Sequence, residues 1–174
     1  MRALADTERI RRFMRVLSAN AEPGTRVYFT GGATAVLLGW RSTTIDVDIK
    51  IIPESDRLLR AIPQIKEDLS INVELASPAD FIPLPPGWDE RGRFIVQEGN
   101  AAFYHFDFYA QALAKVERGH TQDVEDVRTM LALGLIEPAR AKRYFEAIEP
   151  ELYRFPAIDP PSLRKAVEAI FGGR

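Results

Sequence analysis

The stretch that decides the fold runs from Tyr28 to Ile51 and reads YFTGGATAVLLGWRSTTIDVDIKI. Its β-forming start ends at the pair Gly31-Gly32, and a compact helical run follows. A second strand is predicted over 45–52, where apolar and polar residues alternate, so that Asp46 and Asp48 share one face. This order predicts a mixed α/β core with two carboxylates on the polar side of a strand.

The pair Asp46 and Asp48 has the chemistry of a metal site. Residues i and i+2 of a strand face the same way, about 7 Å apart, and paired carboxylates backed by apolar residues suit Mg²⁺ or Mn²⁺. Two such ions about 3.5–4 Å apart can clamp the attacking and leaving oxygens of a phosphoryl transfer. The plainer alternative is a solvated strand face, although strands are poor in aspartate.

The pair Gly31-Gly32 lies between the first strand and the helix. Glycine lets bare backbone N–H groups approach a triphosphate where a helix begins. The alternative is a simple turn. Arg41, just before the acidic strand, can contact phosphate with both ends of its guanidinium, or it can stabilise the end of the preceding helix.

The remaining sequence predicts an α/β (α+β) fold, with a mixed-sheet core at 1–106 and a helical C-terminal bundle at 107–174 of the same compact unit. Two elements carry special features: Pro63 should kink or split its helix, and 77–92 is a proline-rich loop. From the N-terminus to residue 133, the expected elements are a helix at 6–21, a strand at 26–30, a helix at 33–39, a strand at 45–52, a helix at 54–70, a strand at 71–75, a hairpin at 93–97 and 102–106, and helices at 108–118 and 121–133.

Composition excludes several function classes. The chain has no cysteine, which excludes thiolate metal sites and cysteine nucleophiles, and its two histidines exclude a histidine-rich site. A formal net charge of −2 gives no overall basic field for nucleic acid. No apolar run is long enough for a membrane span or signal peptide, so we expect a cytoplasmic protein with no membrane partner.

The spacing Gly-Gly, thirteen residues, Asp-hydrophobic-Asp resembles the signature of DNA polymerase β-like nucleotidyltransferases. In that superfamily the glycine turn binds nucleotide phosphate and the aspartates bind divalent metal. The segment from Arg41 through Thr44 to Asp48 is similar to the Arg-x-Thr-Thr-x-Asp-hydrophobic-Asp stretch of the AbiEii and MenT-type toxin branch. The resemblance therefore implies that Gly31, Gly32, Arg41 and Thr44 contact the nucleotide.

The superfamily often has a third metal-binding carboxylate on a neighbouring strand. Glu74 is the best match, because it alternates with apolar residues on the strand expected at 71–75. Asp80 and Asp107 are competitors, and a strand glutamate can also be merely exposed. We predict Glu74 as the third ligand.

A second motif begins at Lys115, which lies at the rim of an apolar helix stripe and is followed, after a turn, by Asp123 and Asp126. Asp123 lies close to the apolar face of its helix, so its carboxylate must be paired or capping. The order resembles the downstream lysine and Asp-x-x-Asp of the AbiEii-type branch, which implies that Lys115 contacts phosphate while an aspartate orients it or acts as a base. The alternative is a bridge between two helices.

Together these features predict a Mg²⁺-dependent nucleotidyltransferase that moves a nucleoside monophosphate from an NTP to an acceptor hydroxyl, in a cleft between core and bundle. The resemblance implies tRNA or another nucleic-acid end as acceptor and a cognate antitoxin as partner, as in toxin–antitoxin pairs. The alternative is an inactive nucleotidyltransferase fold kept as a binding or regulatory module. The aromatic density around Tyr104 and Phe106 indicates core, with base stacking by one ring left open.

Overall fold

The computed structural model describes residues 2–173, which form two compact units. The first unit comprises the chain up to Ser77 together with Arg93–His105. The second comprises Pro78–Gly92 and the chain from Phe106 onward. The predicted class, a mixed-sheet core followed by helices, is confirmed, and the proline-rich loop belongs to the helical unit.

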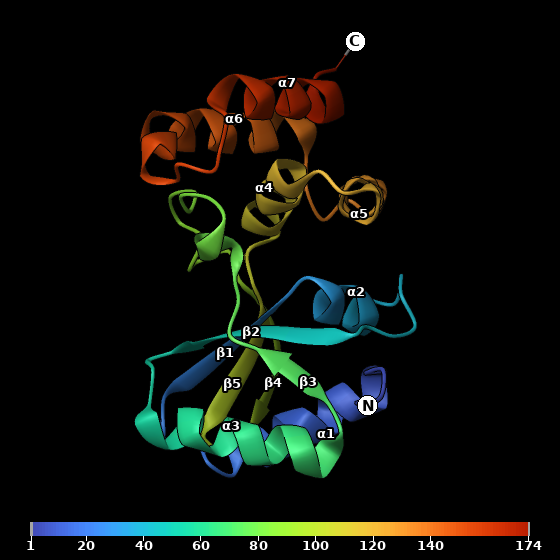
Figure 1. The fold of residues 1–174 in the computed structure, drawn as a ribbon, viewed down its shortest axis with the longest axis vertical. Helices are drawn as coiled ribbons and strands as arrows, with labels where there is room; N and C mark the ends of the chain where they lie inside the picture. The colour runs from blue at the N-terminus through green and yellow to red at the C-terminus, as the bar shows by residue number, and fades with distance from the viewer. Residues whose placement is uncertain (1, 174) are drawn as a thin grey trace. The chain divides into compact units, whose positions relative to one another are not determined.

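A five-stranded mixed sheet forms the centre of the first unit, in the order β3-β2-β1-β5-β4 (Figure 1). The central pair β1 and β2 is antiparallel, β1 runs parallel to β5, β2 runs parallel to β3, and β4 is antiparallel to β5. The strands are β1 (Thr25–Thr30), β2 (Asp46–Ile52), β3 (Asn72–Glu74), β4 (Arg93–Glu98) and β5 (Ala101–His105).

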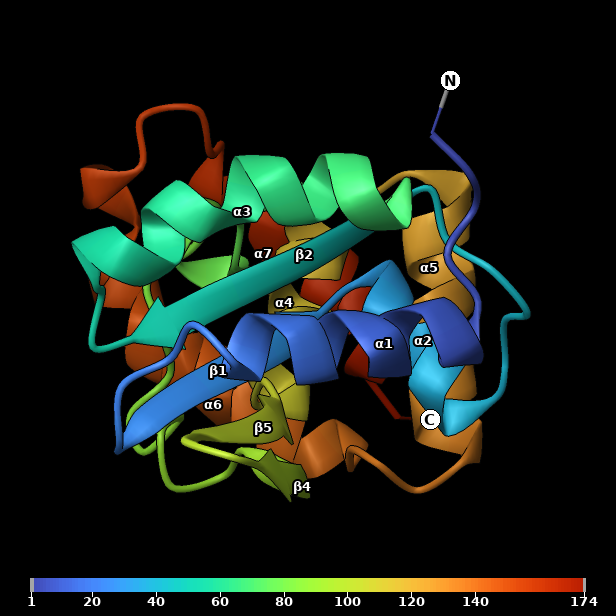
Figure 2. The ribbon, with the colours of Figure 1, turned by 90° about the horizontal axis from the view of Figure 1, so that it is seen from below.

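Two amphipathic helices, α1 (Thr7–Ser18) and α3 (Asp56–Leu69), lie side by side over one face of this sheet (Figure 2). Asp6 caps α1 by accepting a hydrogen bond of 2.9 Å from the backbone N–H of Arg9. The expected split at Pro63 is wrong, since α3 is one helix. Pro63 is exposed, so the carbonyl that loses its hydrogen-bond donor can turn to water.

The face of the sheet opposite α1 and α3 is called here the carboxylate face. Val47, Ile49 and Ile51 are buried on the helix side of β2, so Asp46 and Asp48 point to the carboxylate face, as the alternation predicts. The alternation does not extend beyond the paired residues. Ile45 and Leu75 lie within the strands expected at 45–52 and 71–75, but they are 70% and 56% exposed because they lie just outside β2 and β3.

Helix α2 (Gly32–Leu38) connects β1 to the loop before β2 and ends at Gly39, whose left-handed backbone (φ 92°) suits glycine. At the other side of the sheet, β4 and β5 form the predicted hairpin, and its turn consists of Gly99 and Asn100.

The second unit is organised around α4 (Phe108–Arg118), which contacts three other helices and is buried from Phe108 to Val116. The next helix begins at Thr121, and His120 occupies its cap position. Within residues 2–173, no helix is long and apolar enough to cross a membrane. The other elements are η1 (Pro78–Asp80), α5 (Thr121–Ala132), α6 (Pro138–Ile148), η2 (Glu149–Arg154) and α7 (Pro160–Phe171).

Candidate active site

The glycine turn lies directly against the carboxylate of Asp48. Gly31 has φ 63°, a backbone conformation that residues with side chains rarely adopt. A Cβ added to Gly31 would lie 3.1 Å from Oδ2 of Asp48. The first predicted glycine and the second predicted aspartate are therefore neighbours, and a side chain at position 31 would crowd the space beside the carboxylate.

Gly32 has a different reason to be glycine. A Cβ at this position would overlap the side chain of Thr44, lying 2.8 Å from its Cβ, and would come within 3.2 Å of an Arg41 guanidinium nitrogen. The missing side chain thus leaves room for two residues of the Arg-x-Thr-Thr segment. Gly31, Gly32, Arg41, Thr44 and Asp48, predicted separately as site residues, are brought together here.

Thr44 is fixed from two sides. Its backbone exchanges hydrogen bonds of 2.8 and 2.9 Å with Ala5, in an isolated antiparallel bridge. Its hydroxyl donates a hydrogen bond of 3.0 Å to the backbone carbonyl of Asp46. Thr44 therefore fixes where β2 starts and places Asp46 relative to the glycine turn.

The neighbouring strand β3 presents two polar residues beside the aspartates. Asp46 is paired with Asn72 and Asp48 with Glu74 in the parallel register, so all four lie on the carboxylate face. The Asn72 amide donates a hydrogen bond to Oδ1 of Asp46 and lies 3.5 Å from Oε1 of Glu74, while its carbonyl accepts one of 3.0 Å from Arg2.

Asn72 was not predicted from the sequence as a site residue. The available signal was its position two residues before Glu74, which places both side chains on the same face of a strand. A neutral amide that donates to Asp46 orients that carboxylate without neutralising its charge.

The two competitors of Glu74 lie in the other unit. Asp107 is buried and caps α4 by accepting hydrogen bonds from the N–H groups of Tyr109 and Ala110, at 3.1 and 3.3 Å. It also accepts two hydrogen bonds, of 3.1 and 2.8 Å, from the Arg91 guanidinium. Asp80 ends the 3₁₀ turn η1. Of the three candidates, Glu74 alone lies on the sheet that carries Asp46 and Asp48.

The donor set on the carboxylate face fits a hard divalent cation. In the described part of the chain, residues 2–173, no three acidic, histidine or cysteine side chains are close enough to hold an ion between them. Mg²⁺ does not require such a cage, because it is commonly held by one or two carboxylates together with substrate phosphates and water. Asp46 and Asp48 supply two carboxylates, and Glu74 as the third remains a prediction.

The second predicted motif forms a buried charged cluster between α4 and α5. Lys115 Nζ donates a hydrogen bond of 2.8 Å to Oδ2 of Asp126 and lies 3.7 Å from Oδ1 of Asp123. Asp123 also lies 3.7 Å from Arg118, and Gln122 donates to Asp126 at 3.2 Å.

The two aspartates of this cluster differ in their distance from Lys115. Asp126 is 1% exposed and is the closer partner of Lys115. Asp123 is paired, as its position near the apolar face requires. Both carboxylates therefore hold the Lys115 ammonium group in place. These contacts are expected if the aspartates orient Lys115 toward phosphate, and they are equally expected if the three residues only bridge two helices.

His105, at the end of β5, is a neutral buried partner. Its Nδ1 shares a hydrogen bond of 3.0 Å with the hydroxyl of Thr34 in α2. Burial, and then the positive charge of Arg93, lowers the pKa of His105 from 6.5 to about 4. Because the ring is uncharged at neutral pH, it links α2 to the sheet without adding charge near the glycine turn.

A mixed sheet with a glycine turn beside an Asp-x-Asp strand is the arrangement that the resemblance to nucleotidyltransferases implied. The chain matches the family described as "Nucleotidyltransferase of unknown function (DUF6036)" over residues 6–152 of its 174. The chain belongs to this family. No curated protein matches it.

One similar solved structure is the "Crystal structure of an antigenic nucleotidyltransferase-like protein from Paracoccidioides brasiliensis". The similarity has a TM-score of 0.51 and covers 98% of this chain and 100% of that one, at 14% sequence identity. At this identity the likeness shows the fold alone. It agrees with the architecture described above.

Proposed function

We propose that the protein is a Mg²⁺-dependent nucleotidyltransferase that moves a nucleoside monophosphate from an NTP to an acceptor hydroxyl. The observation that carries the proposal is the contact of Gly31 with Asp48, on a face shared with Asp46 and Glu74. It is supported by membership of a nucleotidyltransferase family. Intact carboxylates favour an enzyme over an inactive module, because a pure binding module has no need for a metal-binding pair.

In the proposed reaction, the acceptor oxygen forms a bond to the α-phosphorus as the bond from that phosphorus to the bridging oxygen breaks. Pyrophosphate leaves, and the hydroxyl proton passes to a carboxylate of the site or to water. A divalent cation, when bound, neutralises charge on the phosphates and positions them. The chain's own contribution is to orient Asp46 through Asn72 and Thr44, and to keep the space beside Asp48 open.

The cluster at Lys115 is proposed to bind the triphosphate. A lysine acts on phosphate as a point charge, and Asp123 and Asp126 are proposed as positioning residues that hold its ammonium group. The finer assignments from resemblance, namely a tRNA acceptor, a cognate antitoxin and a toxin role, are part of the same proposal. They rest on the motifs alone.

The test is incubation with Mg²⁺, each labelled NTP and total tRNA, comparing the wild type with Asp48→Asn. We expect label transfer by the wild type and a loss of at least about 10²-fold in the variant. The matched control is Asp68→Asn, an exposed aspartate of α3 in the same unit, which should retain full activity. Nucleotide binding without transfer would favour the regulatory module, and neither binding nor transfer at millimolar NTP would contradict the proposal.

The motif at Lys115 has a test of its own. Lys115→Met keeps the aliphatic length and removes the charge, but it leaves Asp123 and Asp126 buried without the lysine. We therefore expect both weaker NTP affinity and a lower unfolding free energy, and the affinity is measured at a temperature at which circular dichroism shows the variant to be folded. If the affinity is unchanged, Lys115 is only a bridge between helices, while the role of Asp48 is unaffected.

A further inference from the structure

We propose that the carboxylate face binds single-stranded nucleic acid, with Phe94 and Tyr104 as a base-stacking surface on the same face as Asp46 and Asp48. This inference rests on the proposed function, because it identifies the acceptor class. It starts from a feature that the fold does not explain. Phe94 lies on the edge strand β4 and is 57% exposed.

Phe94 is the outer member of a row of three aromatic rings. The ring of Tyr104 is 5.6 Å from that of Phe94, edge to face, and 5.2 Å from that of Tyr28, stacked at 22°. The strand pairing aligns Phe94 with Tyr104 and Tyr104 with Tyr28, so the row crosses β4, β5 and β1 on one face. Tyr28 is buried while Tyr104 is half-buried, and the row therefore becomes accessible toward β4.

The same pairing shows that this row lies on the carboxylate face. Tyr28 is aligned with Lys50 of β2, and Lys50 lies two residues from Asp48. Phe94 is on the third strand from β2, roughly 15 Å from it at the usual strand spacing. A strand of nucleic acid with its end at Asp46 and Asp48 could therefore place earlier bases on Tyr104 and Phe94.

Charge divides the carboxylate face into two halves. The acidic residues Asp46, Asp48 and Glu74 lie on β2 and β3. The residues of β1, β5 and β4 that share this face include no acidic residue: Arg26, Tyr28, Thr30, Ala102, Tyr104, Phe94 and Gln97. Two cations lie at the Tyr28 end of the aromatic row: Lys50 is aligned with Tyr28, and Arg26 donates a hydrogen bond of 3.1 Å to the Tyr28 hydroxyl.

Aromatic rings with neighbouring cations are the combination that holds unpaired bases and their phosphates. A duplex hides its base faces and gives such a row nothing to stack on. A protein ligand would use the exposed ring of Phe94 but has no general need for the cations at the Tyr28 end of the row. The chain's net charge of −2 does not oppose this inference, since the relevant field is local.

The test is fluorescence anisotropy of a labelled single-stranded 12-mer RNA of mixed sequence, measured in EDTA so that no metal contributes. We expect binding by the wild type, roughly tenfold weaker binding by Phe94→Ala, and retained binding by Phe94→Trp. The matched control is Tyr153→Ala, which removes an aromatic ring that is 79% exposed in the helical unit and should leave affinity unchanged. A duplex of the same sequence should bind at least tenfold more weakly.

The inference is overturned if the RNA does not bind, if Phe94→Ala and Tyr153→Ala behave alike, or if the duplex binds as well as the single strand. Metal-dependent NTP binding by the same preparations separates this inference from the proposed function. If the protein binds the RNA but no NTP, the RNA-binding inference is supported and the proposed nucleotidyltransferase function is contradicted. If the protein transfers label to another acceptor but does not bind the RNA, the proposed function is supported and the RNA-binding surface is contradicted.

Discussion

Asp46 on β2 and Asp126 on α5 are carboxylates with opposite surroundings. Asp46 is half-buried, accepts a hydrogen bond from the neutral Asn72 amide, and forms no ion pair within residues 2–173. Asp126 is fully buried and lies 2.8 Å from the Lys115 ammonium. The difference indicates separate tasks. We propose that the charge of Asp46 is left for a cation from solution, whereas the charge of Asp126 holds a lysine inside the chain.

The largest expected loss of stability comes from removing the carboxylate of Asp126 on α5. Asp126→Ala leaves Lys115 buried with only the longer contact to Asp123, and we expect the unfolding free energy to fall by about 3 kcal/mol. The matched substitution Asp46→Asn removes no ion pair and should change it by less than about 0.5 kcal/mol.

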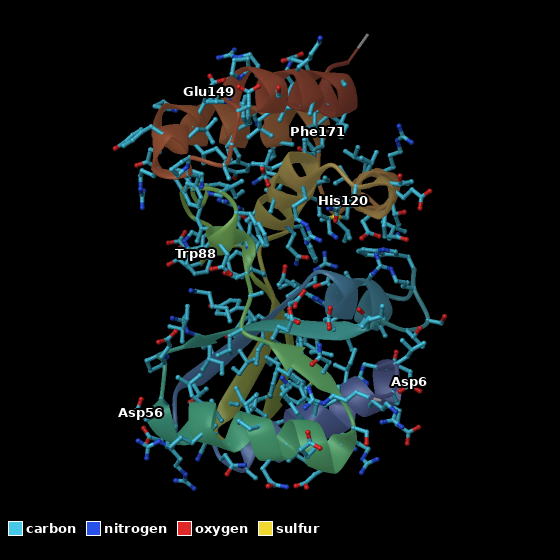
Figure 3. The ribbon with its side chains drawn as sticks, in the orientation of Figure 1. Asp6, Asp56, Trp88, His120, Glu149 and Phe171 are labelled. Atoms are coloured by element: carbon cyan, nitrogen blue, oxygen red, sulfur yellow. The ribbon has the colours of Figure 1, made fainter. Side chains whose placement is uncertain are left out.

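Guanidinium denaturation measures this prediction in a Trp40→Phe background, where Trp88 (Figure 3) reports on the helical unit. The ring of Trp88 is stacked on that of Phe106, with 4.9 Å between the ring centres. For Asp46→Asn the reporter is Trp40 in a Trp88→Phe background. Equal losses for the two aspartate variants would show that the carboxylates do not differ as described.

A comparable effect concerns His105, a buried ionisable group whose pKa is lowered. Because burial lowers the pKa of His105 to about 4, the unfolded chain binds the proton more tightly. The stabilisation by neutral His105 is complete above pH 6.5 and is lost as the pH falls toward about 4, by about 3 kcal/mol in total. Denaturation of the wild type and His105→Gln at several pH values measures it. The free-energy difference between them should change across this window, and a constant difference would refute the prediction.

A smaller effect tests the packing beside the carboxylate face. Gly32→Ala forces a Cβ into the space occupied by Thr44, and we expect a loss of about 1–3 kcal/mol. The double variant Gly32→Ala/Thr44→Ala removes part of the clash and should recover part of the loss. Thermal denaturation of the four proteins in this cycle gives the coupling. Additive losses would mean that the two side chains do not compete for the same space.

The smallest effect sharpens the role of Asn72. Asn72→Ala should raise the Mg²⁺ concentration needed for half-maximal transfer by roughly 10–100-fold, because Asp46 loses the group that orients it. Rates at saturating Mg²⁺ should largely recover, and Asn72→Gln should restore part of the affinity. A lower maximal rate with unchanged Mg²⁺ dependence would instead indicate a merely structural residue.

The first unit could be predicted largely from the sequence because its signals are local. Period-two alternation identified the burial of Val47 and Ile49 and the shared face of Asp46 and Asp48. The alternation failed at Ile45, because burial ends where strand pairing ends and the sequence does not mark that residue. The predicted split at Pro63 was wrong for a related reason. The destabilisation caused by the hydrogen bond that proline removes depends on whether water reaches the helix there.

Contacts between segments distant in the sequence could not be predicted. Nothing near Gly32 indicates that Thr44 fills the space beside it, and the link between Arg91 and Asp107 depends on the path of a loop. For Asp126, the sequence indicated a helix but not the neighbouring helix that buries the side chain. Single side chains on one element are predictable, whereas their partners require the fold.

The central claim is that Asp46 and Asp48 hold a divalent cation for nucleotide transfer. Its most direct test is electron paramagnetic resonance of Mn²⁺ titrated with the protein in the presence of a non-hydrolysable NTP analogue. We predict that the wild type and Asp68→Asn remove the free Mn²⁺ signal, and that Asp46→Asn and Asp48→Asn do so at least about tenfold less tightly. Equal Mn²⁺ binding by all four proteins would contradict the claim.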